Sequence, residues 1–317
     1  MFSFIKMLEN FLRNLKKKKG LWFTTLSVIS IVGISFSMYI LMTMTENVSK
    51  EVYVRMSETY NTNLVNRINR KEQNFKKIIA SVYSNSNLIT AMEQNNINAV
   101  DTVINSYNEN LKKNGFDEMS IKYYTSSNQI NQYRNSINSV ITNKNKIFGI
   151  EVLNDGIFVI LIEPILKDEN VLGVLEVKES IHTLKAQFQQ DNAIFAFLLD
   201  QKMLAKLSLQ AKTGKYRDVI DDYKIEEQKY DGSFFAKLIE NGKDGFKQLL
   251  DVGYLVDDTY YKTYKKISDI NGATIGLVIL GEKIEGSGAF VNIVDKMTKT
   301  VTTVALGLVI SILLFMF

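Results

Sequence analysis

The chain has 317 residues, of which 46% are hydrophobic and 23% charged, a composition typical of a folded protein of one or two domains. It contains no cysteine and a single histidine, which excludes disulfide bonds, thiolate metal sites and cysteine nucleophiles. The net charge of +4 is uneven: residues 1–20 carry +5 and the rest of the chain −1. A nucleic-acid-binding protein places basic charge on its folded domain, so this distribution indicates membrane topology instead.

Two uncharged stretches lie near the ends of the chain. Residues 21–44 follow four lysines at 16–19 with only Gly20 between, and residues 300–317 end the chain. About 20 apolar residues cross a bilayer, and flanking positive residues stay cytoplasmic. We expect residues 21–44 to span the membrane with the N-terminus inside, with a signal peptide or a buried helix as the alternatives. We expect residues 300–317 to be a second span, truncated before a cytoplasmic output module; a short natural anchor is the alternative.

Residues 46–83 contain no glycine or proline, and apolar side chains recur at every fourth position from Val48 to Ile68. This pattern predicts one long stalk helix with a single apolar face. We expect a homodimer, with the face from Val48 to Ile68 as its candidate surface. Shorter helices are predicted at residues 88–94 and 97–113.

Residues after Gly115 change to short runs of β-branched and aromatic side chains separated by turn signals, which predicts an antiparallel sheet. The predicted strands are residues 119–125, 148–153, 156–166 and 171–177. A helix at 180–190, a strand at 193–200, a helix at 232–240 and strands at 260–267 and 274–280 follow.

The second half of the chain repeats the first in shorter form. Gly173 and Gly276 each precede an apolar strand, and each follows a strand and a turn. Asn271 and Gly272 tolerate the positive φ of a type I′ turn, so a hairpin is expected there. The repeat favours a duplicated α+β module.

Several segments resemble the double Cache domain of bacterial chemoreceptors and sensor kinases, most closely its third type. They are FGIEVLNDGI at 148–157, IEPI at 162–165, LGVLEV at 172–177, FAFLLDQK at 195–202, YKKISD at 264–269 and IGLVILGE at 275–282. The resemblance covers residues 46–285 in the family's order. It implies a stalk helix carrying two PAS-like antiparallel-sheet modules, of which the membrane-distal one binds a small molecule.

The expected organisation combines this resemblance with the two spans. It comprises a cytoplasmic basic segment (1–20), a transmembrane helix (21–44), a stalk helix (45–84), a membrane-distal module (85–190), a membrane-proximal module (191–284), a linking helix (285–299) and a second transmembrane helix (300–317).

The family's basic residues are only partly present in this sequence. Its arginine after the E-V-G motif is replaced at Asn154, and the arginine of the next strand is replaced at Ile160, whereas Arg134 matches a family arginine. Tyr123 and Tyr124 point to opposite faces of their strand, so only one can face a pocket. Surface charge or a structural salt bridge is the alternative for Arg134 and Glu151. The expected ligand-binding residues are Tyr123, Tyr124, Arg134, Glu151, Phe158 and Ile160.

The chain shows no set of residues typical of an enzyme. His182 has no neighbouring acid and nucleophile, and we expect it at the surface; no cofactor or metal is expected. The sequence therefore predicts the extracytoplasmic, ligand-sensing portion of a transmembrane chemoreceptor in the cytoplasmic (inner) membrane, with a periplasmic sensing domain. The alternatives are the sensor of a histidine kinase or diguanylate cyclase, or a non-sensing structural membrane protein of the same fold. The expected partners are a small-molecule ligand, the membrane and a second copy of the chain, but not nucleic acid.

Overall fold

The computed structural model describes residues 19–126, 133–227, 229–240, 242–285, 296–297, 299–308 and 310. The chain divides into two compact units, one of Met1–Arg55 with Ser287–Phe317 and one of Met56–Gly286. Both predicted sheet modules belong to the second unit.

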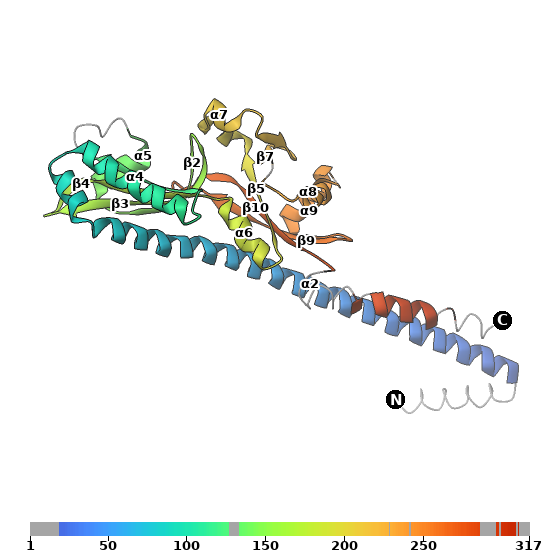
Figure 1. The fold of residues 1–317 in the computed structure, drawn as a ribbon. Helices are drawn as coiled ribbons and strands as arrows, with labels where there is room; N and C mark the ends of the chain where they lie inside the picture. The colour runs from blue at the N-terminus through green and yellow to red at the C-terminus, as the bar shows by residue number, and fades with distance from the viewer. Residues whose placement is uncertain are drawn as a thin grey trace. The chain divides into compact units, whose positions relative to one another are not determined.

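The long helix α2 (Lys19–Tyr83) contains both the predicted first span and the predicted stalk (Figure 1). In the described part of the chain it is the one helix long and apolar enough to cross a membrane, its candidate segment being Ile31–Tyr83. Of the predicted second span, residues 300–308 and 310 are helical, and the remainder lies outside the described residues.

The distal module is a four-stranded antiparallel sheet in the order β1-β4-β3-β2. Helix α4 packs against β1, and α5 packs against β3 and β4. The elements are α3 (Ser86–Glu93), α4 (Ile97–Lys113), β1 (Met119–Thr125), α5 (Asn135–Asn143), β2 (Ile147–Leu153), β3 (Gly156–Lys167) and β4 (Asn170–Ser180).

The proximal module is a six-stranded antiparallel sheet in the order β6-β7-β5-β10-β9-β8. Its elements are α6 (Thr183–Gln190), β5 (Ile194–Asp200), the 3₁₀ helix η2 (Gln201–Lys206), α7 (Leu209–Lys212), β6 (Tyr216–Asp218), β7 (Tyr223–Glu226), α8 (Gly232–Ile239), α9 (Gly242–Val252), β8 (Tyr254–Val256), β9 (Tyr260–Ser268) and β10 (Thr274–Lys283). Strands β8-β9-β10-β5 repeat the order of β2-β3-β4-β1, and β6 and β7 extend that repeat. The two sheets therefore have the duplicated arrangement that the sequence predicts.

The two repeat glycines occupy equivalent places in these sheets. A Cβ on Gly173 would lie 2.4 Å from the ring of Tyr123 on β1, and a Cβ on Gly276 would lie 2.1 Å from the carbonyl oxygen of Leu198 on β5. In both modules a glycine is thus needed where two strands approach closely. These strands are β4 and β1 in one module and β10 and β5 in the other.

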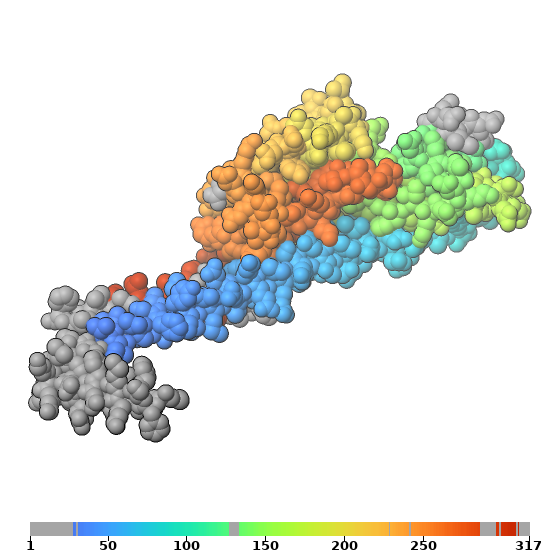
Figure 2. Space-filling view, turned by 180° about the vertical axis from the view of Figure 1, so that it is seen from behind, coloured from blue at the N-terminus to red at the C-terminus, as the bar shows by residue number. Residues whose placement is uncertain are grey.

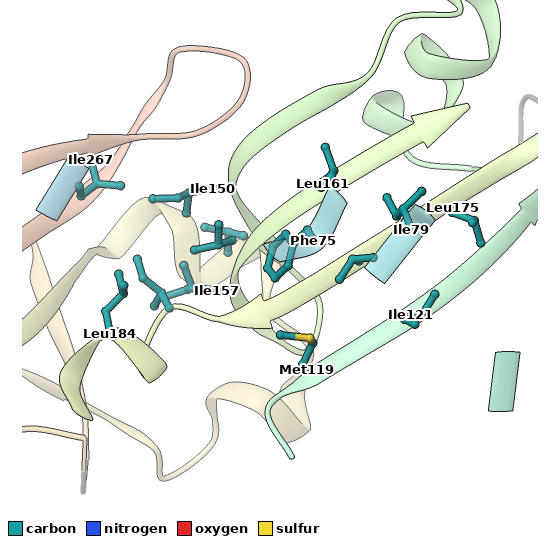
Figure 3. Packing of buried hydrophobic residues seen from close by; sticks show 14 of the residues in the cluster. Phe75, Ile79, Met119, Ile121, Ile150, Ile157, Leu161, Leu175, Leu184 and Ile267 are labelled. Carbon is teal, nitrogen blue, oxygen red and sulfur yellow. The ribbon is translucent and has the colours of Figure 1, made fainter. Parts of the chain in front are cut away.

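One face of both sheets shares a continuous core with α2. Phe75, Ile79 and Leu64 of α2 are at most 1% exposed and pack in the same cluster as residues of β3 and β4. Figure 3 shows Phe75 and Ile79 among Leu161 and Leu175, and Figure 2 shows the adjoining part of α2 lying along both modules. Burial of this apolar surface is the main contribution to the stability of the unit.

The predicted dimer surface is wrong where the helix meets the sheets. Leu64 is fully buried, and Tyr60 and Ile68 pack against the same intramolecular core. The apolar stripe of a helix turns towards the largest apolar surface available to it, which here belongs to the chain's own sheets. The predicted homodimer itself stays a prediction.

One turn prediction also needs correction. The β9–β10 hairpin forms, but of Asn271 and Gly272 only the glycine has positive φ (+82°), so the turn is not type I′. Positive φ at two successive residues occurs instead in the β3–β4 turn, at Asp168 (47°) and Glu169 (66°). Asp168 is only a weak indication of positive φ and Glu169 is none, so local sequence did not predict that conformation.

His182 is not a surface residue. Its side chain is 9% exposed, and its Nε2 lies 2.8 Å from Glu226 Oε2 on β7. The contact joins the segment after β4 to the proximal sheet, a long-range pairing that local sequence does not indicate.

Candidate functional site

The outer face of the distal sheet, opposite α2, is only partly covered by helix. The nine-residue helix α5 packs its apolar side on this face, and the resulting small core consists of Ile137, Val140, Ile141, Ile160, Ile162 and Val174. Beside α5 the sheet is hollowed by a cavity of about 850 Å³. Its described lining residues are Lys122, Tyr123, Tyr124, Tyr133, Arg134, Asn135, Ser136, Glu151, Val152, Leu153, Asn154, Asp155, Glu176, Lys178, Lys206 and Asn271.

Arg134, immediately before α5, lies at the centre of a charged cluster in this cavity. Its Nε donates to Ser136 Oγ (2.8 Å) and to Glu151 Oε2 (3.1 Å), and its Nη1 donates to the Tyr124 hydroxyl (3.1 Å). Its Nη2 forms an ion pair with Glu176. Three strands and the start of α5 therefore each contribute a polar group to one point.

The acidic members of the cluster are well shielded from water. The side chain of Glu176 is 1% exposed and that of Glu151 is 12% exposed, against 25% for Arg134. A buried carboxylate is tolerated only with a charged or hydrogen-bonding partner, and Arg134 supplies one to both glutamates. With two carboxylates around one guanidinium, the cluster carries one excess negative charge.

Tyr124 contributes a polar hydroxyl that stays protonated. Burial raises the pKa of Tyr124 above its ordinary value of 10.0, although the nearby Arg134 opposes that shift. The same hydroxyl donates to Glu176 Oε1 at 3.3 Å. Tyr124 is thus a hydrogen-bonding wall of the cavity, and its ring packs edge-on against Tyr133 at 5.2 Å.

Positive side chains surround this acidic interior. Lys122 Nζ lies 5.1 Å from the centre of the Tyr124 ring, and Lys178 pairs with Asp155. Lys206, at the end of η2, is 45% exposed and also lines the cavity. The cavity therefore has a negative interior and a positive rim.

The six predicted site residues fall into two groups. Tyr124, Arg134 and Glu151 are brought together in the cluster described above. Tyr123 borders the cavity, but its hydroxyl donates to the Leu172 carbonyl (3.0 Å) and it packs against the inner core.

The other two predicted residues do not line the cavity. The ring of Phe158 lies 4.2 Å below Lys178 Nζ, and Ile160 is fully buried against α5. Both belong to the small apolar core under α5, next to the polar groups of the cavity.

Sequence reasoning missed most of the polar lining residues, among them Ser136, Glu176, Lys178, Lys206 and Asn271. A usable signal existed for two of them. Glu176 lies between Leu175 and Val177 on the predicted strand 171–177, and Lys178 directly follows that strand; a charge at every second position of a buried strand marks a polar face. The other three are brought in by long-range contacts.

Within the described ranges, no group of three or more histidine or acidic side chains is placed to hold a metal ion. The side chains that line the cavity offer hydrogen-bond donors and acceptors, charges of both signs and aromatic faces.

No family model and no curated protein matches the chain. Among solved structures it is similar to the extracellular domain of the putative histidine kinase vpHK1S-Z8, at 11% identity and a TM-score of 0.40, covering 76% of this chain and 93% of that one. It is also similar to the ligand-binding domain of the Campylobacter jejuni chemoreceptor Tlp3 in complex with 4-methylisoleucine (13% identity, TM-score 0.39, 79% and 96% covered). The periplasmic domain of Vibrio cholerae LuxQ matches at 11% identity and a TM-score of 0.31, covering 80% and 99%.

Proposed function

We propose that the chain is the extracytoplasmic, ligand-sensing portion of a transmembrane chemoreceptor, and that the cavity of the distal module binds its ligand. The observation that carries the proposal is the convergence of Arg134, Glu151, Glu176 and Tyr124 on one cavity of about 850 Å³. Cavities of about 300–1,000 Å³ with a few convergent polar groups are typical of small-molecule sites.

The charges favour a ligand that carries an ammonium group. The guanidinium of Arg134 already contacts two carboxylates, a hydroxyl of Ser136 and a hydroxyl of Tyr124, so it offers little to an incoming carboxylate. The excess negative charge lies on Glu151 and Glu176 at the bottom of the cavity. A primary amine supplies both the compensating charge and three hydrogen-bond donors.

The N-terminal part of the chain supports the membrane component of the proposal. The uncharged residues 21–44 follow the lysines at 16–19 and lie within α2, whose later part forms the core of the sensing unit. A helix that enters this core directly gives a ligand-dependent change in the sheets a physical route towards the membrane.

The test is a thermal-shift panel on the full chain in lipid nanodiscs, followed by circular dichroism. The panel holds the twenty L-amino acids, together with 3-methylbutylamine and 4-methylpentanoate, the amine and acid analogues of leucine. A ligand present at about 100 times its Kd stabilises the folded state by about 2.7 kcal/mol, which raises the melting temperature by several degrees. We expect ammonium-bearing compounds to give the shift and simple carboxylates not to.

The test variant is the double substitution Arg134→Met with Glu176→Gln, which removes one positive and one negative charge, while Glu151 keeps the hydrogen bond from Ser136. It is expected to fold and to lose the shift. A panel without any stabilising compound, or a shift that survives in the double variant, would overturn the proposal.

A further inference from the structure

The cavity of the distal module has a wall that belongs to the proximal module. Asn271, in the turn between β9 and β10, and Lys206, at the end of η2, both line it. All the other lining residues come from β1, β2, β4, the β2–β3 turn and the start of α5 with the residues just before it. In the sequence Lys206 and Asn271 lie 28 and 93 positions after Lys178, the nearest distal lining residue, and 65 positions apart from each other.

The hairpin tip is fixed directly to the sheet that carries the cavity. The backbone N–H of Ile270 donates to the carbonyl of Ile150 on β2 at 3.0 Å. The Ile270 side chain lies so close to Gly149 that a Cβ on that glycine would be 2.8 Å from Ile270 Cγ2. Gly149 and Glu151 are on the same face of β2. The hairpin therefore contacts β2 only two residues from Glu151, a carboxylate of the charged cluster.

The turn that presents Asn271 is internally ordered. The Asp269 side chain is 2% exposed, and its Oδ1 accepts the backbone N–H groups of Asn271 (2.9 Å) and Ala273 (3.0 Å). Its Oδ2 lies 3.5 Å from Lys206 Nζ. One buried carboxylate therefore positions both proximal residues at the cavity, and the exposed Asn271 amide is available there.

The strands of the hairpin continue from the cavity to α2. On β9, Thr263 Oγ1 lies 2.5 Å from Ser57 Oγ, and Tyr261 stacks on Tyr60 at 6.1 Å between ring centres. Thr263 and Tyr261 are fully buried. A displacement of the hairpin tip is thus transmitted along β9 to Thr263 and Tyr261, which pack against α2.

From these contacts we propose that the ligand site is shared between the two modules. Resting on the proposed function, the inference is that the ammonium group lies against Glu151 and Glu176, while an anionic end of the same small zwitterion is bound by Asn271 and Lys206. A ligand held at both ends fixes the β9–β10 hairpin to the distal sheet, and through β9 it acts on α2. Occupancy of the site then shifts the population of docked hairpins.

The first test is an affinity comparison by calorimetry on the full chain in nanodiscs. Asn271→Ala changes an exposed side chain whose backbone N–H keeps its bond to Asp269, so folding is preserved. Each of the twenty L-amino acids is titrated, with 3-methylbutylamine as the matched compound that has no carboxylate. We expect Asn271→Ala to weaken amino-acid binding by about tenfold and amine binding by less than about twofold. The control is Thr274→Ala on the same hairpin, which does not line the cavity.

The second test uses the absence of cysteine, since Asn271→Cys introduces the only thiol of the chain. An amino acid that binds across both modules should slow alkylation of that thiol and leave the Thr274→Cys variant unaffected. Amino-acid affinity that is unchanged in Asn271→Ala, together with an unprotected thiol, overturns the shared site while the proposed function stands. The same holds if only amines raise the melting temperature. A panel in which no compound binds overturns both.

Discussion

The two modules share one strand order, but the outer faces of their sheets differ. With the repeat glycines Gly173 and Gly276 superposed, Glu176 of β4 corresponds to Ile279 of β10. The glutamate faces a cavity, whereas Ile279 is fully buried in an apolar cluster under α8 and α9. The same outer face of the sheet is therefore a binding surface in the distal module and a packed core in the proximal one.

The difference has a clear structural cause. The distal face is covered by the single helix α5, whereas the proximal face is covered by α8 and α9, which supply Phe234 and Phe246. Gly281, two positions beyond Ile279, leaves room for Phe234, because a Cβ there would lie 2.6 Å from its ring. At the equivalent distal position stands Lys178, at the rim of the cavity. Large aromatic side chains close one site, and charged ones keep the other open.

The largest expected effect follows from removing an aromatic side chain from the closed site. Phe234 is fully buried and packs edge-on against Tyr260 at 5.3 Å. Phe234→Ala should lower the free energy of unfolding by about 3–5 kcal/mol, measured by urea unfolding of the full chain. Tyr124→Phe, which removes one hydroxyl from the open site, should lower it by only about 1 kcal/mol. Equal losses would contradict the contrast between a packed and an open face.

Breaking the charged cluster should have the next largest effect. Arg134→Met leaves Glu176, which is 1% exposed, without its cation, and should destabilise the protein by about 3 kcal/mol. Adding Glu176→Gln removes the buried charge and should restore most of the loss. If the second substitution restores nothing, the two side chains do not stabilise each other as the structure indicates.

A smaller effect is expected where the hairpin meets β2. Gly149→Ala places a methyl group against Ile270 and should lower the free energy of unfolding by about 1–3 kcal/mol. In the background Ile270→Ala the same change should lower it by much less, because the close contact is absent. Additive losses in this double-mutant cycle would show that the two residues do not touch.

Part of this arrangement was accessible from the sequence. The strands, the long helix and the duplicated meander follow from alternation, from the absence of glycine and proline in residues 46–83 and from the two repeat glycines. Glu151 and Tyr124 could be selected because each lies on a predicted strand of the distal sheet, and Arg134 because it matches a family arginine. They do converge on one cavity.

The rest depended on contacts between distant segments. Helix α9 was not predicted because it contains two glycines, which have low helix propensity. The burial of Phe246 and Leu249 outweighs that effect. Nothing local to Gly149 indicates that Ile270 lies against it. The apolar stripe of α2 was visible, but whether it faces a second chain or the chain's own sheets is decided only by the folded structure.

The smallest predicted effect concerns pH and the contact between α2 and the proximal sheet. Burial raises the pKa of Glu282 above its ordinary value of 4.5, although a hydrogen bond from Tyr60 opposes the shift. The folded state therefore favours the protonated carboxyl, and stability is lost as the pH rises from 4.5 through the raised pKa. Glu282→Gln should raise the melting temperature slightly at neutral pH and leave it unchanged near pH 4. The same substitution at the exposed Glu58 should have no effect at either pH.

The proposed site binds an ammonium-bearing small molecule in the acidic interior of the distal cavity. Its most direct test is calorimetric titration of the wild-type chain and of Glu151→Gln with the panel amino acid that gives the largest thermal shift. We expect the substitution to weaken binding by about tenfold or more, because it removes a negative charge from the ligand's side of the cluster. Equal affinity in the two proteins would contradict it.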